Sequence, residues 1–327
     1  MFDRSPILVT GIPRSGTSWV GKMLEASRAC VYINEPLNPR HPPGGSPGVL
    51  NADVCHRFQY IDEPNEQSYL QPFRDTLALK YHVISELRAN RSPSDLLRML
   101  KNWTAFTEGR IRRKRPLVDD PYAAFSCEWF ARRLGCDVVV VVRHPAAVAA
   151  SRKRLGWRID LADLLDQREL LTRRLAPFRT DLERLHATNH DVVAETALLW
   201  RMIYATAHDV ANRNENVHIV RNEDLSLHPV DRYRQLYETV GLHFDARAHA
   251  AVVRSTTGPD RRQAHTWSIS KGGISRTGYR RLDSKANVSL WTKLLTPAEI
   301  ASVRLATADV ASLFYSEEDW DIPRARE

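Results

Sequence analysis

The chain has 327 residues, of which 43% are hydrophobic and 26% are charged, a composition typical of globular proteins and a length that suits one large α/β domain or two small ones. The formal net charge of +8 suits an anionic ligand, but the basic residues are spread over many predicted helices, which argues against a nucleic-acid-binding protein. No stretch approaches 18 uninterrupted apolar residues, so we expect no membrane span. No signal peptide fits before the first strand, and the four cysteines lack metal-ligand spacing, so we expect a cytoplasmic protein with free thiols.

The first predicted element is a short buried strand at residues 7–9, followed by a glycine-rich turn at residues 11–16 that opens directly into a helix. The apolar positions of that helix are Trp19, Val20, Met23 and Leu24. A strand, a glycine loop and a helix N-terminus together form an anion site, because several backbone N–H groups converge there and the helix dipole favours negative charge.

The spacing of this loop, Gly11-x4-Gly16, is nearly that of a Walker A motif, but Thr17 stands where the Walker lysine would be. The basic residue is Arg14, inside the loop. A P-loop kinase or NTPase needs that lysine on the β- and γ-phosphates. The loop is therefore predicted to hold a 5′-phosphate-like group without being built to split a triphosphate.

A second short strand is predicted at residues 31–33, and it ends at the tripeptide Asn34-Glu35-Pro36. Residues 36–48 contain five prolines and three glycines, so they are predicted to form an irregular loop. A loop that directly follows a strand near an anion site commonly shapes substrate access.

The rest of the chain alternates between helices and strands. Ser92 and Pro93 are typical of a helix start, the basic run at residues 110–115 is predicted to be a solvated turn, and residues 161–185 are predicted to form one or two helices. Further helices are expected at residues 128–134, 145–154, 192–212, 230–240 and 297–313, and further strands at 116–119, 138–142 and 217–220. This alternation predicts an α/β fold, a P-loop NTPase-like parallel sheet flanked by helices, and no internal repeat or boundary divides residues 1–327 into more than one domain.

A second motif follows the strand at residues 138–142. Arg143 comes at the carboxyl end of that strand, where ligands bind in open α/β sheets, and Ser151 follows eight residues later, two turns into the next helix. A guanidinium and a hydroxyl make a suitable clamp for a phosphate monoester, although an arginine after a strand is often only an ion-pair partner.

The two motifs together resemble those of the sulfotransferases that use 3′-phosphoadenosine-5′-phosphosulfate (PAPS). Residues 13–19 are similar to the 5′-phosphosulfate loop of that family, and Arg143 with Ser151 is similar to its 3′-phosphate motif. Arg14, together with the Glu35-Pro36 pair, is closer to carbohydrate-type and bacterial members than to cytosolic small-molecule enzymes. The resemblance implies the sulfotransferase fold and transfer of a sulfuryl group from PAPS to an acceptor hydroxyl, with no metal.

The resemblance also implies roles for the loop residues. Arg14 would stabilise the leaving phosphate and the transferred sulfonate, backed by N–H groups and hydroxyls of the following residues. Trp19 resembles the family tryptophan that stacks on adenine, and its alternative is a core position of the first helix. The nucleotide-binding residues are predicted to be Arg14, Ser15, Gly16, Thr17, Ser18, Trp19, Arg143 and Ser151.

Transfer needs a base for the acceptor proton, and Glu35 is the prediction. It follows the second strand, and Glu35-Pro36 resembles the acidic site of carbohydrate-type members; the alternative is that it caps a turn or pairs with an arginine. Asp119 is the second candidate, because it ends a strand where cytosolic members place a catalytic histidine that this chain lacks.

The polar loop at residues 255–285 is predicted to cover the nucleotide, with Arg276 completing the 3′-phosphate site. Loops at residues 36–60 and 155–190 are expected to select the acceptor, either a carbohydrate, glycolipid or glycosylated natural product or a phenolic or lipid hydroxyl. A P-loop small-molecule kinase is the more remote alternative, and neither the acceptor nor the oligomeric state follows from the sequence.

Overall fold

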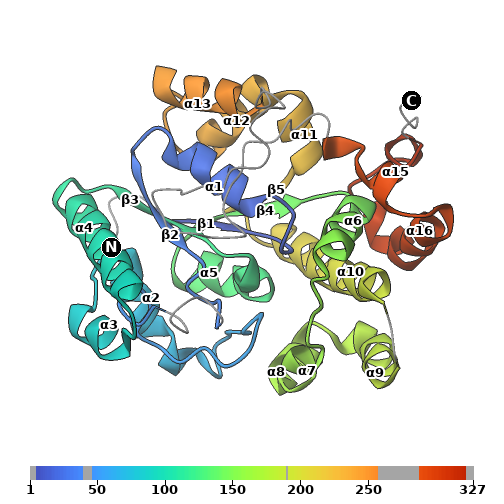
Figure 1. Cartoon of the computed structure of the whole chain (residues 1–327), viewed down its shortest axis with the longest axis horizontal. Helices are drawn as coiled ribbons and strands as arrows, with labels where there is room; N and C mark the ends of the chain where they lie inside the picture. The colour runs from blue at the N-terminus through green and yellow to red at the C-terminus, as the bar shows by residue number, and fades with distance from the viewer. Residues whose placement is uncertain (1–4, 40–45, 189–190, 257–286, 322–327) are drawn as a thin grey trace.

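The computed structural model describes residues 5–39, 46–188, 191–256 and 287–321. Its centre is a parallel sheet of five strands in the order β2-β3-β1-β4-β5 (Figure 1). The strands are β1 Ile7–Thr10, β2 Cys30–Asn34, β3 Arg115–Asp119, β4 Asp137–Val142 and β5 Val217–Arg221. The predicted α/β fold is confirmed, and each predicted strand lies within one residue of its observed ends.

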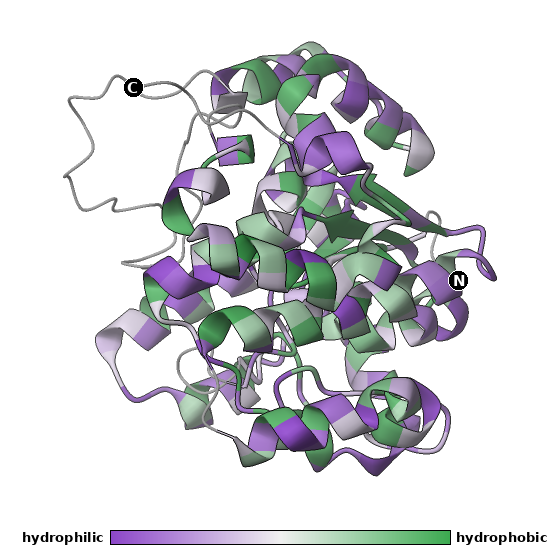
Figure 2. Cartoon of the chain, turned by 90° about the vertical axis from the view of Figure 1, so that its right-hand side faces the viewer, coloured by the Kyte–Doolittle hydropathy of each residue, from purple (hydrophilic) through white to green (hydrophobic). Residues whose placement is uncertain are grey.

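Strand side chains alternate between two cores, which explains why the strands read as continuous apolar runs. Val9 and Val141 point into one core, which is covered by α1 Thr17–Glu25, α12 Pro229–Thr239 and α13 Ala246–Thr256. Leu8 and Val140 point into the other, which is covered by α5 Cys127–Arg133 and α10 Val192–Ala211. Figure 1 shows these helices on opposite faces of the sheet, and Figure 2 shows the strands as a hydrophobic layer between them.

The remaining helices flank this unit. They are α2 Leu70–Leu77, α3 Val83–Ala89, α4 Pro93–Ile111, α6 Pro145–Leu155, α7 Ala162–Leu165, α8 Arg168–Arg173, α9 Arg179–Ala187, α11 Asn222–Leu227, α15 Trp291–Leu294 and α16 Pro297–Ala311. The predicted start of α4 is confirmed, since the Ser92 side chain accepts a hydrogen bond from the Asp95 N–H and Pro93 occupies the first turn. Among the described residues, no helix is both long and apolar enough to cross a membrane.

The prediction of one or two helices at residues 161–185 is wrong, because the segment contains the three short helices α7, α8 and α9. The Gln167 side chain, between α7 and α8, forms hydrogen bonds to a distant loop: it donates to the Phe58 carbonyl at 3.2 Å and accepts from the Tyr60 N–H at 2.7 Å. These bonds fix the break between α7 and α8 against the loop at residues 58–60, and Pro177 precedes α9.

The prediction that residues 110–115 form a solvated turn is wrong at both ends, because residues 110–111 end helix α4 and Arg115 begins strand β3. This side chain is buried, where its guanidinium donates to the carbonyls of Ser5 and Val240 and pairs with Asp137. It thereby joins the start of β1, the end of α12 and the start of β4, three segments that are far apart in the sequence.

Replacing Arg115 by Ala is expected to lower the free energy of unfolding by about 3 kcal/mol, because it leaves buried carbonyls and one carboxylate without their partner. Arg110 is exposed in the same basic run, so Arg110→Ala is the matched control and should change stability by less than about 0.5 kcal/mol. Urea denaturation of the two variants measures both. Equal losses would contradict a structural role for Arg115.

Candidate active site

The glycine-rich loop between β1 and α1 has a backbone that only glycine accepts at two points. Gly11 and Gly16 have φ angles of 147° and 104°. A Cβ atom at Gly11 would lie 2.5 Å from the Val141 carbonyl oxygen, and one at Gly16 would lie 2.3 Å from Nδ2 of Asn222. The loop is therefore pressed against the ends of β4 and β5, which brings the two predicted motifs together.

The N-terminus of α1 fits an anionic group. Gly16 precedes α1, and no side chain caps the helix by a hydrogen bond. The first N–H groups of a helix lack intrahelical partners and carry partial positive charge. This uncapped helix end beside Arg14 is what a 5′-phosphate would require.

Helix α10 holds both motifs in place from below the sheet. The Tyr204 hydroxyl donates to the Val141 carbonyl at 2.7 Å and accepts from the Ile12 N–H at 3.4 Å. Trp200 Nε1 donates to the Arg143 carbonyl at 2.8 Å. Both rings are fully buried, so α10 is a rigid support for the loop and for Arg143.

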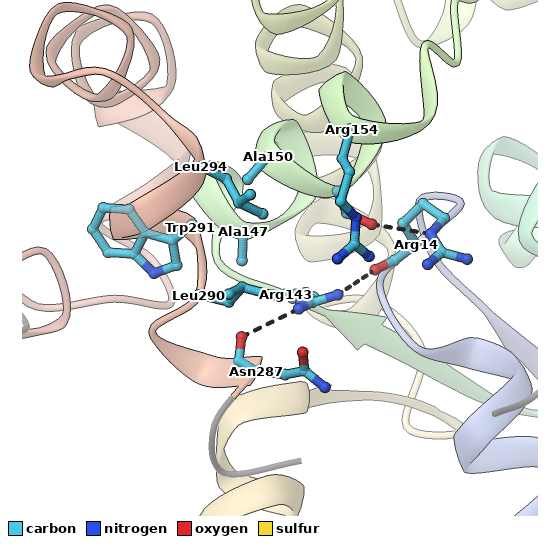
Figure 3. Close-up of a pocket in the computed structure, with 10 residues that line it drawn as sticks. Arg14, Arg143, Ala147, Ala150, Arg154, Asn287, Leu290, Trp291 and Leu294 are labelled. Atoms are coloured by element: carbon cyan, nitrogen blue, oxygen red, sulfur yellow. Dashed lines mark hydrogen bonds between the residues drawn. The ribbon is translucent and has the colours of Figure 1, made fainter. Parts of the chain in front are cut away.

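Three of the predicted site residues, Arg14, Arg143 and Ser151, line one small pocket. Figure 3 shows Arg14 and Arg143 in this pocket. Arg143 donates from a terminal guanidinium nitrogen to the Arg14 carbonyl at 3.0 Å, and Arg14 Nε donates to Ser151 Oγ at 3.1 Å. The second terminal nitrogen of Arg143 faces the Asn287 carbonyl at 3.5 Å. The 5′ and 3′ motifs are thus hydrogen-bonded to each other.

The pocket is strongly cationic. Arg14, Arg143 and Arg154 line it, and no carboxylate does among the described residues. Burial lowers the pKa of Arg14, and the neighbouring Arg143 and Arg154 lower it further. Three guanidiniums in a pocket that no carboxylate of the described residues lines favour the binding of an anion, so the residues present fit a phosphate.

Sequence reasoning missed Arg154 and Asn287. Arg154 lies three residues after Ser151 on α6, so helical spacing places both on one face, a signal that was available. Asn287 accepts a hydrogen bond from Arg143 through its backbone carbonyl, and no sequence pattern predicts such a backbone contact.

Behind the pocket, a buried carboxylate offsets the charge of Arg143. Glu223 accepts from the His144 N–H at 2.9 Å and from the Tyr315 hydroxyl at 3.0 Å, and its charge acts to raise the pKa of Arg143 against the effect of burial. The His144 ring stacks on Trp291 with centroids 4.9 Å apart, and burial lowers its pKa to about 3. A neutral His144 therefore packs the C-terminal segment against the strand end that carries Arg143.

Trp19, on helix α1, packs against α12 and α13. Its Nε1 donates to Ser255 Oγ at 3.1 Å, and its ring meets Tyr233 edge-to-face with centroids 5.5 Å apart. The ring is partly buried against that core and partly exposed, so core packing accounts for only part of its surface. Stacking on adenine stays a prediction. Arg276, and nearly all of the predicted nucleotide-covering loop, lie outside the described residues.

Glu35 follows β2 in an unusual backbone conformation, with φ of 45°. Its N–H donates to the Asp119 carbonyl at 2.8 Å, and its carboxylate accepts from Asn38 Nδ2 at 2.6 Å. Burial raises the pKa of Glu35 to about 7, and Asp119 adds to the rise while the bond from Asn38 opposes it. Within the described residues, Glu35 forms no ion pair with an arginine, although its bonds to Asn38 do brace a turn.

Asp119, the second candidate base, is fully buried. Burial raises its pKa, while hydrogen bonds from Tyr32, Ser18 and Thr17 act to lower it. The Ser18 and Thr17 hydroxyls thus turn toward Asp119. The following residue, Asp120, accepts from the Leu37 N–H at 2.6 Å and thereby holds the chain just after Glu35. These contacts make the Asp119-Asp120 pair a scaffold between α1 and the Glu35 loop.

Fold and site together define an α/β protein with a cationic pocket at the carboxyl edge of its parallel sheet, a kind of site that suits phosphate groups. Residues 6–246 match the family model described as the sulfotransferase family, and the chain belongs to that family. It is a sulfotransferase, and this membership favours sulfuryl transfer over the kinase alternative. Comparison with curated proteins gave no match.

Three solved structures are similar to the chain. The sulfotransferase domain from the curacin biosynthetic pathway is 16% identical, with 96% of this chain and 98% of that chain covered and a TM-score of 0.49. The sulfotransferase domain from the Synechococcus PCC 7002 olefin synthase is 16% identical, with coverage of 99% and 98% and a TM-score of 0.48. Mouse sulfotransferase SULT7A1, complexed with PAP, is 12% identical, with coverage of 96% and 86% and a TM-score of 0.41.

Proposed function

We propose that the enzyme transfers the sulfuryl group of PAPS to a hydroxyl of a carbohydrate, glycolipid or glycosylated natural product, with Glu35 as general base. The observation that carries the proposal is the pair of linked anion sites at one sheet edge, with a carboxyl of raised pKa at the end of β2 on that edge. The proposal invokes no metal ion, and it treats residues 1–327 as a single domain.

PAPS supplies an activated sulfuryl group on a phosphate leaving group. Arg143, Ser151 and Arg154 would hold its 3′-phosphate, and the N–H groups at the start of α1 together with Arg14 would hold the 5′ end. As the bond from sulfur to the leaving phosphate breaks, negative charge grows on that phosphate. Arg14 and the preorganised N–H groups would stabilise this charge more in the transition state than in the ground state.

Glu35 would accept the proton of the acceptor hydroxyl as the oxygen bonds to sulfur. A carboxylate with a pKa of about 7 is a stronger base than an ordinary one, and it is about half ionised at neutral pH and largely ionised above it. Asp119 is fully buried and bound by Tyr32, so we assign it a positioning role.

The acceptor class can be tested directly by assaying transfer from PAPS to a panel of free sugars, glycolipids, simple phenols and alkyl alcohols. We expect transfer to sugar hydroxyls, because the acidic Glu35-Pro36 site resembles that of carbohydrate-type members. Transfer confined to phenols or alkyl alcohols would support the alternative acceptor class and refute the carbohydrate assignment.

The four cysteines are free, which supports a reducing compartment such as the cytoplasm.

The pH dependence of kcat should show an acidic limb near pH 7, because Glu35 must be ionised to act as a base. Activity should rise through that pH and then level off. The same carboxyl stabilises the folded state most below its unfolded pKa of 4.5, and that contribution is lost as the pH rises through about 7. An acidic limb near pH 4.5 would show that burial does not raise the pKa of Glu35 in the working enzyme.

A further inference from the structure

Large apolar side chains are exposed mainly on α3 and α4. Twelve such side chains are exposed among the described residues, and seven of them lie on these two helices. We define the apolar surface as Ile84, Leu87, Leu96, Leu97, Leu100 and Trp103. Scattered exposed leucines need no explanation, but a concentration on two adjoining helices indicates an interaction surface.

The spacing of these residues gives each helix an apolar stripe. Leu96, Leu100 and Trp103 follow an i, i+4, i+7 pattern along α4, and Ile84 and Leu87 are three apart on α3. The two helices pack against each other at the β2 side of the sheet (Figure 1). Ile84 on α3 and Leu97 on α4 are 68% and 69% exposed, and the stripe residues of α4 are 40–44% exposed, so these side chains reach solvent.

The charges beside the apolar surface are mostly positive. Arg88, Arg91, Lys101 and Arg110 are exposed on the same stretch of chain. Of the three acidic residues at positions 83–111, Glu86 and Asp95 are buried. The third, Glu108, is paired with Lys114 at 2.9 Å. The surface therefore presents leucine, isoleucine and tryptophan side chains with a surplus of cations.

This chemistry fits an anionic lipid surface better than a second copy of the chain. Amphipathic helices that lie in a membrane interface combine apolar side chains, tryptophan and flanking Lys and Arg, and anionic headgroups attract the cations. A symmetric dimer through the same surface would place these cations opposite one another, and each chain already carries a net charge of +8.

The apolar surface is connected to the proposed acceptor side. Glu86 on α3 accepts hydrogen bonds from the Gly48 N–H at 2.7 Å and from Ser46 Oγ at 2.9 Å. These two residues end the irregular loop that begins after Glu35. On α4, a Cβ atom at Gly109 would lie 2.2 Å from Val31, so α4 packs closely on β2, the strand that leads to Glu35.

We propose that α3 and α4 dock the enzyme onto an anionic lipid surface, and that this surface presents the hydroxyl acceptor. The second half of the statement rests on the proposed function, whereas docking itself does not. The helices lie on the lipid surface: the apolar side chains enter the headgroup boundary and the cations face anionic headgroups.

Flotation of the full chain with vesicles tests the docking. We expect binding to vesicles of phosphatidylcholine and phosphatidylglycerol, weaker binding to pure phosphatidylcholine, and release by salt. The double variant L97S/W103S should bind at least about tenfold more weakly, because two exposed apolar side chains no longer enter the lipid. Leu305 is 83% exposed on α16, so L305S is the matched control and should bind like the wild type.

The charged part is tested by R88Q/K101Q, which should lower affinity for the anionic vesicles by about fivefold per charge and reduce the salt effect. Calorimetric binding of 3′,5′-adenosine bisphosphate checks that each variant remains folded. Absence of vesicle binding by the wild type, or equal binding by L97S/W103S and L305S, would overturn the proposal. So would a wild-type dimer in light scattering that L97S/W103S converts to a monomer. Vesicle binding with no transfer to any acceptor would instead refute the proposed function alone.

Discussion

Glu35→Gln is expected to lower kcat by about 10²–10⁴-fold, the contribution typical of a positioned general base. The amide oxygen can still accept the hydrogen bond that Asn38 Nδ2 donates to the Glu35 carboxylate, so the loop should keep its shape. Binding of 3′,5′-adenosine bisphosphate should change by less than about twofold, because Glu35 lies outside the cationic pocket. The measurements are kcat with PAPS and a carbohydrate acceptor, and calorimetric titration of the bisphosphate.

Two controls separate catalysis from folding in this experiment. The variant should be at least as stable as the wild type above pH 7, because it no longer buries an ionised carboxylate. Asn38→Ala should move the acidic limb of the pH profile upward, because the bond from Asn38 lowers the pKa of Glu35. If Glu35→Gln keeps kcat within a few-fold of the wild type, Glu35 is not the base.

Arg143→Ala should weaken the binding of 3′,5′-adenosine bisphosphate by about 2–3 kcal/mol, the scale of a lost charge-assisted hydrogen bond. Binding of AMP should hardly change, because AMP has no 3′-phosphate to lose. The wild type should accordingly prefer the bisphosphate to both AMP and ATP in the absence of metal. Calorimetry with the three nucleotides measures these differences.

Arg234 is a matched control for Arg143, since it is an exposed arginine on α12 far along the chain from the pocket. Arg234→Ala should leave all three affinities unchanged. Equal losses for bisphosphate and AMP in Arg143→Ala would show that Arg143 supports the loop, through its bond to the Arg14 carbonyl, and does not read the 3′-phosphate. Preference of the wild type for ATP would contradict the sulfotransferase nucleotide site.

The two anion motifs depend on each other in a way that bears on both experiments. The Arg14 side chain reaches Ser151, and Arg143 reaches the Arg14 backbone, so each site helps to position the other. The effects of substitutions at the two sites are therefore expected to be non-additive. The double variant Arg143→Ala/Ser151→Ala should lose less binding free energy for the bisphosphate than the sum of the losses in the two single variants.

The sequence by itself determined the five strands and the sheet edge at which the predicted nucleotide-binding residues lie. Its strands are runs of buried, mostly β-branched residues such as those of β4, and such runs fit the pleated interior of a parallel sheet wherever they occur. Arg14 and Arg143 lie at the same sheet edge because each follows a strand, and the carboxyl ends of parallel strands share one edge. Here β1 and β4 are neighbours, so that edge brings the two arginines into one pocket.

Only the tertiary structure decided how the site is charged, supported and exposed. Arg115 belongs to a solvated-looking basic run, yet it is buried because Ser5, Val240 and Asp137 converge on it. The pKa of Glu35 depends on burial and on Asp119, a residue of a different strand, and the support of the loop depends on Tyr204 of α10. Desolvation and long-range hydrogen bonds arise only when distant segments pack together. Local sequence patterns therefore do not predict desolvation or long-range hydrogen bonds.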